Sequence, residues 1–174
     1  MSGLLLPFDG HRPQVHPRAF VAPDATLVGQ VSVGAETSIW YKCVLRADEE
    51  PISIGARCNI QDGTVIHVAG GHFPTVIGDD VSVGHMALIH ACTLQSGAFV
   101  GMRAVVMDGV VVEGDAVVAA GALVTPGKRV PAGQLWAGTP ARFVRELSEK
   151  DRKMVREAHD VYLQLARQHQ AARA

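Results

Sequence analysis

The sequence is poor in aromatic residues and carries almost no net charge. Only 5% of its 174 residues are Phe, Tyr or Trp, while 48% are hydrophobic, so a packed core must be built from Val, Ile, Leu and Ala. The formal net charge of -1 offers no electrostatic case for binding nucleic acid or an anionic membrane. The length suits one domain with a sizeable core.

Cysteines and long apolar runs are also scarce. Cys43, Cys58 and Cys92 are odd in number and lack the close spacing of metal ligands, so we expect reduced, buried side chains, as in cytosolic proteins. The first residues, MSGLLLPFDG, contain neither the basic stretch nor the long apolar stretch of a signal peptide. No apolar run approaches the length needed to span a membrane. The expectation is a soluble cytoplasmic protein.

What the sequence does contain is glycine, at 18 positions, and an aliphatic residue at nearly every sixth position. This period is typical of a parallel β-helix, in which each hexad forms one short strand and a corner, and three hexads form one coil. The aliphatic residue should point inward, and the Gly that often follows it should permit the tight corner. A β-sandwich would instead alternate with period two and turn roughly every 8–12 residues. The inward positions are predicted to be Val28, Val33, Ile39, Leu45, Ile54, Ile60, Ile66, Ile77, Val83, Ile89, Leu94, Val100, Val106, Val112, Val118 and Val124.

The repeat implies an order of segments within one domain. We expect residues 1–18 to form an irregular lead-in with one short strand near residues 4–6. Residues 19–130 should form the β-helix, and residues 131–147 a connecting segment. Ser148 and Asp151 resemble a capping box, and apolar residues follow them at helical spacing. Residues 148–172 should therefore form a C-terminal α-helix that packs along the outside of the solenoid.

Counting hexads places three histidines on the coil. His67 and His90 each follow an aliphatic residue by one position and lie three hexads apart, so both should occupy the same position on one face, about 4.8 Å apart. Their imidazoles can therefore share one metal ion. His85 follows its aliphatic residue by two positions and belongs to another face, so it can join them only from a neighbouring subunit related by a three-fold axis. The spacing thus predicts a homotrimer with a metal site at each interface.

The same count places polar residues beside these histidines. Arg46 stacks one coil below His67, and Asp62 stacks one coil below His85, with Gln61 next to it. We expect an ion pair between Arg46 and Asp62 across the subunit boundary. The remaining histidines suit surface positions or satisfied core positions: His11, His16, His72, His159 and His169.

Three neutral imidazoles with an open position are typical of a catalytic zinc site rather than a closed structural one. A bound metal lowers the pKa of its water to about 7, which yields hydroxide at neutral pH. Gln61 is placed to hydrogen-bond that hydroxide and orient it. Fe²⁺ or Co²⁺ would also accept three histidines, and the spacing does not choose among them.

These residues together resemble the gamma-class carbonic anhydrase family of left-handed β-helix proteins. The matching motifs extend over nearly the whole chain: Arg46-x-Asp48, Asn59-x-Gln61-Asp62-Gly63, His67, His85-x4-His90 and Gly138-Thr139-Pro140-Ala141. The left-handed sense of the coil is implied by the resemblance alone. The roles that it implies are metal ligation by His67, His85 and His90, contact with the metal-bound hydroxide by Gln61, and a subunit-interface network of Arg46, Asp48 and Asp62.

The sequence departs from the family pattern in the loop that follows His67. The archetypal member carries an acidic loop there, with a glutamate that shuttles protons, whereas residues 68–72 contain no carboxylate. Glu49 matches the position of a second active-site glutamate, or is a solvated loop charge. His72 is either a substitute shuttle, since imidazole titrates near neutral pH, or a surface loop residue. Tyr162 loosely matches a tyrosine that some members place near the metal, or it is a core-packing residue.

The resemblance implies reversible hydration of CO2 to bicarbonate by a metal-bound hydroxide. We expect Gln61 to orient the nucleophile, Glu49 and Tyr162 to be further catalytic candidates, and turnover to be slow because the shuttle carboxylate is missing. One alternative is a metal-binding protein of the same family with weak catalysis, since some relatives bind ferric siderophores or act as thioesterases. Another is a hexapeptide acyltransferase, which the repeat and the turn at residues 138–141 suggest but the three histidines argue against.

Overall fold

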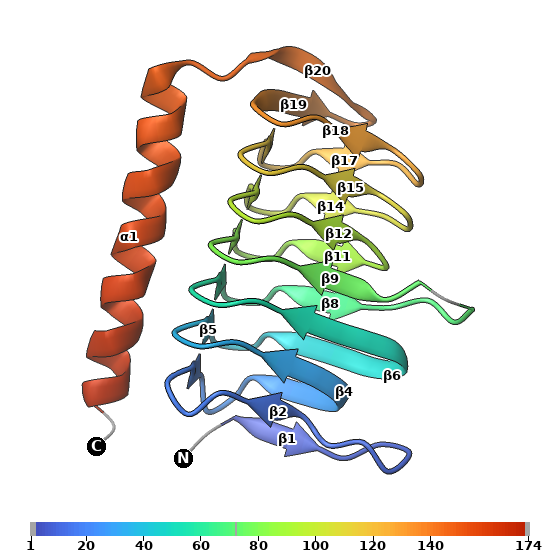
Figure 1. The fold of residues 1–174 in the computed structure, drawn as a ribbon, viewed down its shortest axis with the longest axis vertical. Coiled ribbons are helices and arrows are strands. Elements are labelled where there is room, and N and C mark those ends of the chain that lie inside the picture. Colours follow the sequence, from blue (N-terminus) through green and yellow to red (C-terminus); the bar gives the residue numbers. More distant parts are fainter. Residues whose placement is uncertain (1–2, 72, 173–174) are drawn as a thin grey trace.

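The computed structural model describes residues 3–71 and 73–172 and shows a left-handed parallel β-helix with one long helix beside it (Figure 1). The coils stack from β1 (Leu4–Leu6) and β2 (Gln14–Val15) at one end to β19 (Gln134–Gly138) and β20 (Ala141–Glu146) at the other. The predicted fold class is therefore confirmed.

The coils form a prism with three faces, which are named here by what they carry. The histidine face contains the first halves of β4 (Thr26–Val33) and β6 (Val44–Ile54), then β8 (Val65–His67), β11 (Leu88–His90), β14 (Val105–Val106) and β17 (Leu123–Val124). The second face continues from the far halves of β4 and β6 through β9 (Thr75–Ile77), β12 (Thr93–Leu94), β15 (Val111–Val112) and β18 (Arg129–Val130). The helix face is an eight-stranded sheet of β3 (Phe20–Val21), β5 (Ser38–Ile39), β7 (Asn59–Ile60), β10 (Ser82–Val83), β13 (Phe99–Val100), β16 (Val117–Val118), β19 and β20.

Aliphatic side chains fill the interior of the coils. Ile60, Ile66, Val83 and Ile89 are fully buried. The strand register sets Ile66 opposite Ile89 and Ile60 opposite Val83, so each inward residue stacks on its equivalent in the next coil. The three cysteines are also free and buried, and burial raises the pKa of each thiol to about 12. The expectation of reduced, buried cysteines is confirmed.

Two of the glycines that follow inward residues do not make the tight corners, although the sequence predicts that they should. Gly84 and Gly101 directly follow inward residues, but neither has a positive φ. Instead, a Cβ on Gly101 would lie 2.4 Å from the backbone nitrogen of Ala120 in the next coil. The left-handed backbone occurs two residues later, at Met86 and Arg103, with φ of 60° and 58°. At these two corners glycine is therefore needed for the close approach of stacked coils, and a residue with a side chain makes the turn itself.

Both ends of the solenoid contain more strand than the sequence predicts. In the lead-in of residues 1–18, the expected strand is present as β1, and β2 also pairs with β4. In the connecting segment of residues 131–147, β19 pairs in parallel with β16 and antiparallel with β20. The turn between β19 and β20 contains a cis bond between Thr139 and Pro140. The hairpin thus continues the helix face beyond the last coil, and the divisions at residues 18 and 131 stay predictions.

The C-terminal helix α1 (Glu149–Ala171) begins at the expected capping box. The Ser148 hydroxyl accepts a hydrogen bond from the Asp151 backbone N–H, and the Asp151 carboxylate accepts one from the Ser148 backbone N–H. The helix contacts β3, β5 and β7 of the helix face, where Tyr162 lies edge-on to Trp40 with ring centroids 5.4 Å apart. Within the described part of the chain, no helix is long and apolar enough to cross a membrane.

Candidate metal centre

Two histidines meet at the ends of adjacent strands. His67 ends β8 and His90 ends β11, and the parallel register sets them opposite one another. The Nδ1 atom of His67 lies 3.2 Å from Nε2 of His90, and the ring centroids are 5.2 Å apart. The prediction that they occupy one position on the same face, one coil apart, is confirmed.

A carboxylate holds the outer nitrogen of each ring. Nε2 of His67 lies 3.1 Å from Oδ1 of Asp48, and Nδ1 of His90 lies 2.7 Å from Oδ1 of Asp108. A neutral imidazole has one N–H and an ionised carboxylate can only accept, so these contacts place each proton on the outer nitrogen. The two inner nitrogens then face one another as lone pairs.

Two facing lone pairs fit a cation between them. Two ligand nitrogens of a tetrahedral zinc ion, each about 2.0–2.1 Å from the metal, lie about 3.3 Å apart. The inner nitrogens of His67 and His90 are separated by 3.2 Å. Histidine ligands also tend to donate their second N–H to a carboxylate, which fixes the ring, and both rings have such a partner. The donor set therefore fits zinc, and imidazole nitrogen suits iron or cobalt as well.

The third predicted ligand stands apart from this pair. His85 follows β10 on the helix face, at the corner that leads into the histidine face. Its Nδ1 lies 2.9 Å from Oδ2 of Asp62, the residue that the count of hexads places below it, and its Nε2 lies 3.0 Å from the Tyr162 hydroxyl. Among the residues described, no three His, Cys, Asp or Glu side chains gather closely enough to hold a metal ion. Ligation by all three histidines stays a prediction.

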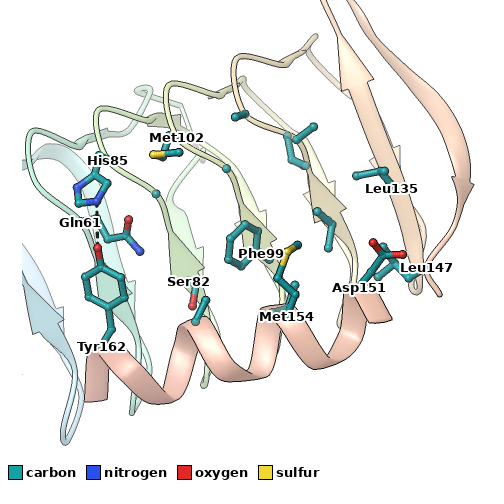
Figure 2. A pocket seen from close by; sticks show the side chains of 18 of the residues that line it. Gln61, Ser82, His85, Phe99, Met102, Leu135, Leu147, Asp151, Met154 and Tyr162 are labelled. Carbon is teal, nitrogen blue, oxygen red and sulfur yellow. Dashed lines mark hydrogen bonds between the residues drawn. The ribbon is translucent and has the colours of Figure 1, made fainter. Parts of the chain in front are cut away.

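Gln61 lies directly after β7, beside His85 and Tyr162 at one end of a cavity (Figure 2). Only 7% of its surface is exposed. Its Nε2 donates a hydrogen bond to Oδ1 of Asn59 at 2.9 Å. That bond fixes the orientation of the amide, so the carbonyl oxygen is the atom available to another partner.

Asp48 ties Arg46 to the histidine pair, because its carboxylate accepts hydrogen bonds from both Arg46 and His67. Burial favours the neutral carboxyl, but the hydrogen bonds from Arg46 and His67 outweigh it and hold the pKa of Asp48 below its ordinary value. Asp48 is therefore charged at neutral pH. Arg46 is engaged within its own chain, and the pair that it is predicted to form with Asp62 of a neighbouring subunit stays a prediction.

The remaining candidates take different places. Glu49 accepts a hydrogen bond from the backbone N–H of Gly70 at 3.2 Å, so it braces the loop after β8. His72 lies outside the described residues. Tyr162 packs against the core, and its hydroxyl lies 3.0 Å from Nε2 of His85. Catalytic roles for Glu49 and Tyr162 stay predictions.

A cavity of about 510 Å³ opens between α1 and the later strands of the helix face (Figure 2). Most of its lining side chains are apolar, among them Phe99 and Met154. Gln61, His85 and Tyr162 lie together at one end. The volume and the convergence of a few polar groups on an apolar wall are typical of small-molecule sites.

Four residues around the centre are not among those predicted to act there: Asp108, Asn59, Ser82 and His159. Asp108 lies 18 residues after His90, which is one coil of three hexads, so the count that pairs the histidines also reaches it. Ser82 and His159 meet only because α1 docks on the helix face, 77 residues further along the chain. No sequence period connects a solenoid corner with a helix.

Comparison with known proteins agrees with the repeat. Residues 96–126 match the family model described as the hexapeptide repeat of succinyl-transferase. Gamma carbonic anhydrase 2, mitochondrial, of Arabidopsis thaliana is 48% identical over 162 residues, which is 90% of this chain and 58% of that protein. Carnitine operon protein CaiE of Escherichia coli strain K12 is 42% identical over 146 residues, 83% of this chain and 73% of that protein. A crystal structure of a hexapeptide transferase family protein from Anaplasma phagocytophilum has a TM-score of 0.90 at 44% identity, covering 94% of this chain and 96% of that one.

Location is the one expectation that these relatives contradict. Gamma carbonic anhydrases 1, 2 and 3 of Arabidopsis thaliana are each named mitochondrial, so the expectation of a cytoplasmic protein is wrong. Composition and fold do not encode location. The chain spans 58% and 61% of the length of gamma carbonic anhydrases 2 and 1. On identity over most of its length, the chain belongs to the gamma carbonic anhydrase family of left-handed β-helix proteins.

Proposed function

We propose that the protein hydrates CO2 reversibly to bicarbonate at metal sites shared between the subunits of a homotrimer. The observation that carries this proposal is the pair of inner nitrogens of His67 and His90, which face one another 3.2 Å apart. Asp48 and Asp108 hold the outer nitrogens, so both lone pairs are free for a cation. When bound, zinc, iron or cobalt supplies hydroxide at neutral pH, because it lowers the pKa of a water molecule to about 7.

The histidine face offers a surface for a second copy. Its outward positions form an apolar column across adjacent strands: Val44 and Val65 are 37% and 39% exposed, and Leu88 and Val105 are half-buried beside them. An exposed apolar column of this kind suits a homo-oligomer interface. Three copies closed around a three-fold axis would bring His85 of one copy toward the histidine pair of the next.

The other polar residues have tasks that follow from their contacts. Nε2 of His85 would be its ligand atom once the Tyr162 hydroxyl moves from it to substrate, because Asp62 holds Nδ1. The carbonyl oxygen of Gln61 would accept a hydrogen bond from the attacking oxygen and orient it toward CO2. Burial and the charge of Asp62 raise the pKa of Tyr162, so its hydroxyl keeps its proton at neutral pH and can donate to a bicarbonate oxygen.

A stopped-flow assay of CO2 hydration tests the proposal, with protein loaded with zinc and protein loaded anaerobically with iron. We expect bicarbonate formation and, by elemental analysis, one metal ion per subunit. His90→Ala should lose both metal and activity, whereas His11→Ala, which changes an exposed histidine, should keep both. Absence of hydration with every metal at full occupancy would overturn the proposal.

The cavity beside His85 favours one alternative, a metal-dependent thioesterase. CO2 needs little of a space of about 510 Å³, whereas the apolar wall along α1 suits the acyl chain of a thioester. Hydrolysis of acyl-CoA without hydration of CO2 would favour the thioesterase. Binding of acyl-CoA without hydrolysis would instead favour the acyltransferase alternative.

A further inference from the structure

A short polar column interrupts the apolar contact between α1 and the helix face. Ser38, Asn59 and Ser82 are neighbours across β5, β7 and β10, and they are 1%, 1% and 3% exposed. The same column continues with Phe20 on one side and Phe99 on the other. Polar groups buried at a helix–sheet contact stabilise less than apolar packing unless each one is hydrogen-bonded. Such a network points to a role beyond packing.

The hydrogen bonds of this column run in one direction, from Gln61 to the helix. Gln61 Nε2 donates to Asn59 Oδ1 at 2.9 Å, and Asn59 Nδ2 donates to Ser82 Oγ at 2.7 Å. Ser82 Oγ lies 3.2 Å from Nδ1 of His159 on α1. A hydroxyl has one proton but can accept two hydrogen bonds, so the tautomer of His159 decides the direction of this last contact. Oδ1 of Asp80 lies 3.7 Å from Nε2 of His159, and its negative charge favours a proton on that nitrogen. His159 therefore accepts at Nδ1 and carries its own proton on Nε2.

We propose that His159 is a positioning residue for Gln61. By accepting a hydrogen bond at Nδ1, His159 sets the direction of the hydrogen-bond chain that runs through Ser82 and Asn59. The carbonyl oxygen of Gln61 therefore faces the corner of His85. This inference rests on the proposed function, in which that oxygen orients the nucleophile. If these hydrogen bonds pointed the other way, Gln61 would present its NH2 group. That group donates and cannot accept a hydrogen bond from a water or hydroxide.

Protonation of His159 reverses the direction of these hydrogen bonds. An imidazolium has an N–H at both nitrogens, so Ser82 must accept from it, and the Ser82 proton is then free to donate to Oδ1 of Asn59 when both amides turn over. Burial lowers the pKa of His159, against the opposing charges of Asp80 and Asp160, and the guanidinium of Arg57 lowers it further. Nε2 of His159 is buried and has no hydrogen-bond partner among the described residues, Asp80 Oδ1 being 3.7 Å away. The expectation of a satisfied position is therefore wrong for this atom. At neutral pH His159 is therefore neutral and the hydrogen bonds point from Gln61 to the helix, whereas in acid their direction reverses.

Two variants separate positioning from packing. His159→Asn keeps an acceptor near the place of Nδ1 but does not titrate, and His159→Leu removes the acceptor. His169→Asn is the matched control. His169 lies on the same helix but bonds the Tyr41 hydroxyl, which is not part of the hydrogen-bond chain from Gln61 to His159. The first measurement is a pH titration of the Gln61 side-chain amide by nuclear magnetic resonance, with the signal assigned from its loss in Gln61→Glu.

We expect the Gln61 amide signal of the intact protein to shift with pH below about 6.5, the ordinary pKa of histidine. The shift should persist in His169→Asn and vanish in His159→Asn. Persistence of the full shift in His159→Asn, or no shift in the unmodified protein, would overturn the proposal. This measurement needs no activity, so it decides the inference even if CO2 hydration is absent.

The second measurement is the pH profile of CO2 hydration by the metal-loaded protein. His159→Leu should lower kcat about tenfold, as loss of an outer-shell partner does, with KM and metal content unchanged. His159→Asn should restore kcat and make the loss of activity on the acid side smaller than in the unmodified protein, the remaining loss being that of the metal-bound hydroxide. A kcat equal to that of the unmodified protein in His159→Leu would contradict the inference, whereas inactivity of the unmodified protein would contradict only the proposed function.

Discussion

At the scale of residues, the position of single protons decides what the candidate centre can bind. The two histidines lie on adjacent strands, and by themselves they would share a proton between their inner nitrogens. Asp48 and Asp108 draw the protons to the outer nitrogens, so the inner nitrogens become a pair of metal ligands. The carboxylates therefore add to metal affinity by orienting the rings that they hold.

Replacement of Asp108 tests this point. Asp108→Ala leaves Nδ1 of His90 without an acceptor, so we expect zinc affinity, measured by competition with a chelator, to fall about 10–100-fold. Asp108→Asn is the matched control, because its amide oxygen can still accept and affinity should stay within a few-fold of that of the unmodified protein. Equal affinities for Asp108→Ala and the unmodified protein would contradict the assigned direction of these hydrogen bonds.

At the scale of elements, the stacking distance between coils governs which residues the corners tolerate. The strands outside β4 and β6 are short, so each coil is held mainly by hydrogen bonds to its neighbours and by the aliphatic columns inside. Close stacking leaves no room for a Cβ at Gly101, directly after the inward residue Val100, whereas the turn that follows carries a side chain at Arg103.

Two glycine substitutions separate close approach from backbone strain. Gly101→Ala places a Cβ 2.4 Å from backbone nitrogen of the next coil, which cannot be relieved by a rotamer change, so we expect a loss of about 3 kcal/mol in the free energy of unfolding. Gly121 has φ of +68° and open space around it, so Gly121→Ala should cost only about 1 kcal/mol of conformational strain. Urea unfolding monitored by circular dichroism measures both. A larger loss for Gly121→Ala would show that strain, not stacking, is the stronger constraint.

At the scale of the whole molecule, the prism separates the predicted ligands. His67 and His90 end strands of the histidine face, while His85 sits at the corner that leads into that face. Because each coil is triangular in cross-section, the corner of His85 and the corner of His67 and His90 both lie on the surface of one chain but stay apart. A complete site of three histidines therefore requires another copy, as the proposed trimer supplies.

Mixed trimers test the shared site directly. His67→Ala and His85→Ala should each abolish complete sites alone. If the two variants are unfolded together and reassembled in equal amounts, random mixing should restore about a quarter of the sites, because each site takes His67 from one subunit and His85 from another. Metal content and CO2 hydration measure the recovery, and separately refolded variants combined without exchange are the control. Failure of metal to reappear in trimers shown to be mixed would refute a site shared in this way.

The sequence by itself determined the solenoid, its inward columns and the pairing of His67 with His90, because a six-residue period acts locally and repeats at every coil. It also determined the capping box at Ser148, which depends on residues three positions apart. The tertiary structure alone decided the proton positions at the histidine pair, the close approach that excludes a Cβ at Gly101, and the chain from Gln61 to His159. The first two depend on exact distances between residues one coil apart, which the period brings near one another without setting the distance. The last depends on the contact between α1 and the helix face, which follows no period.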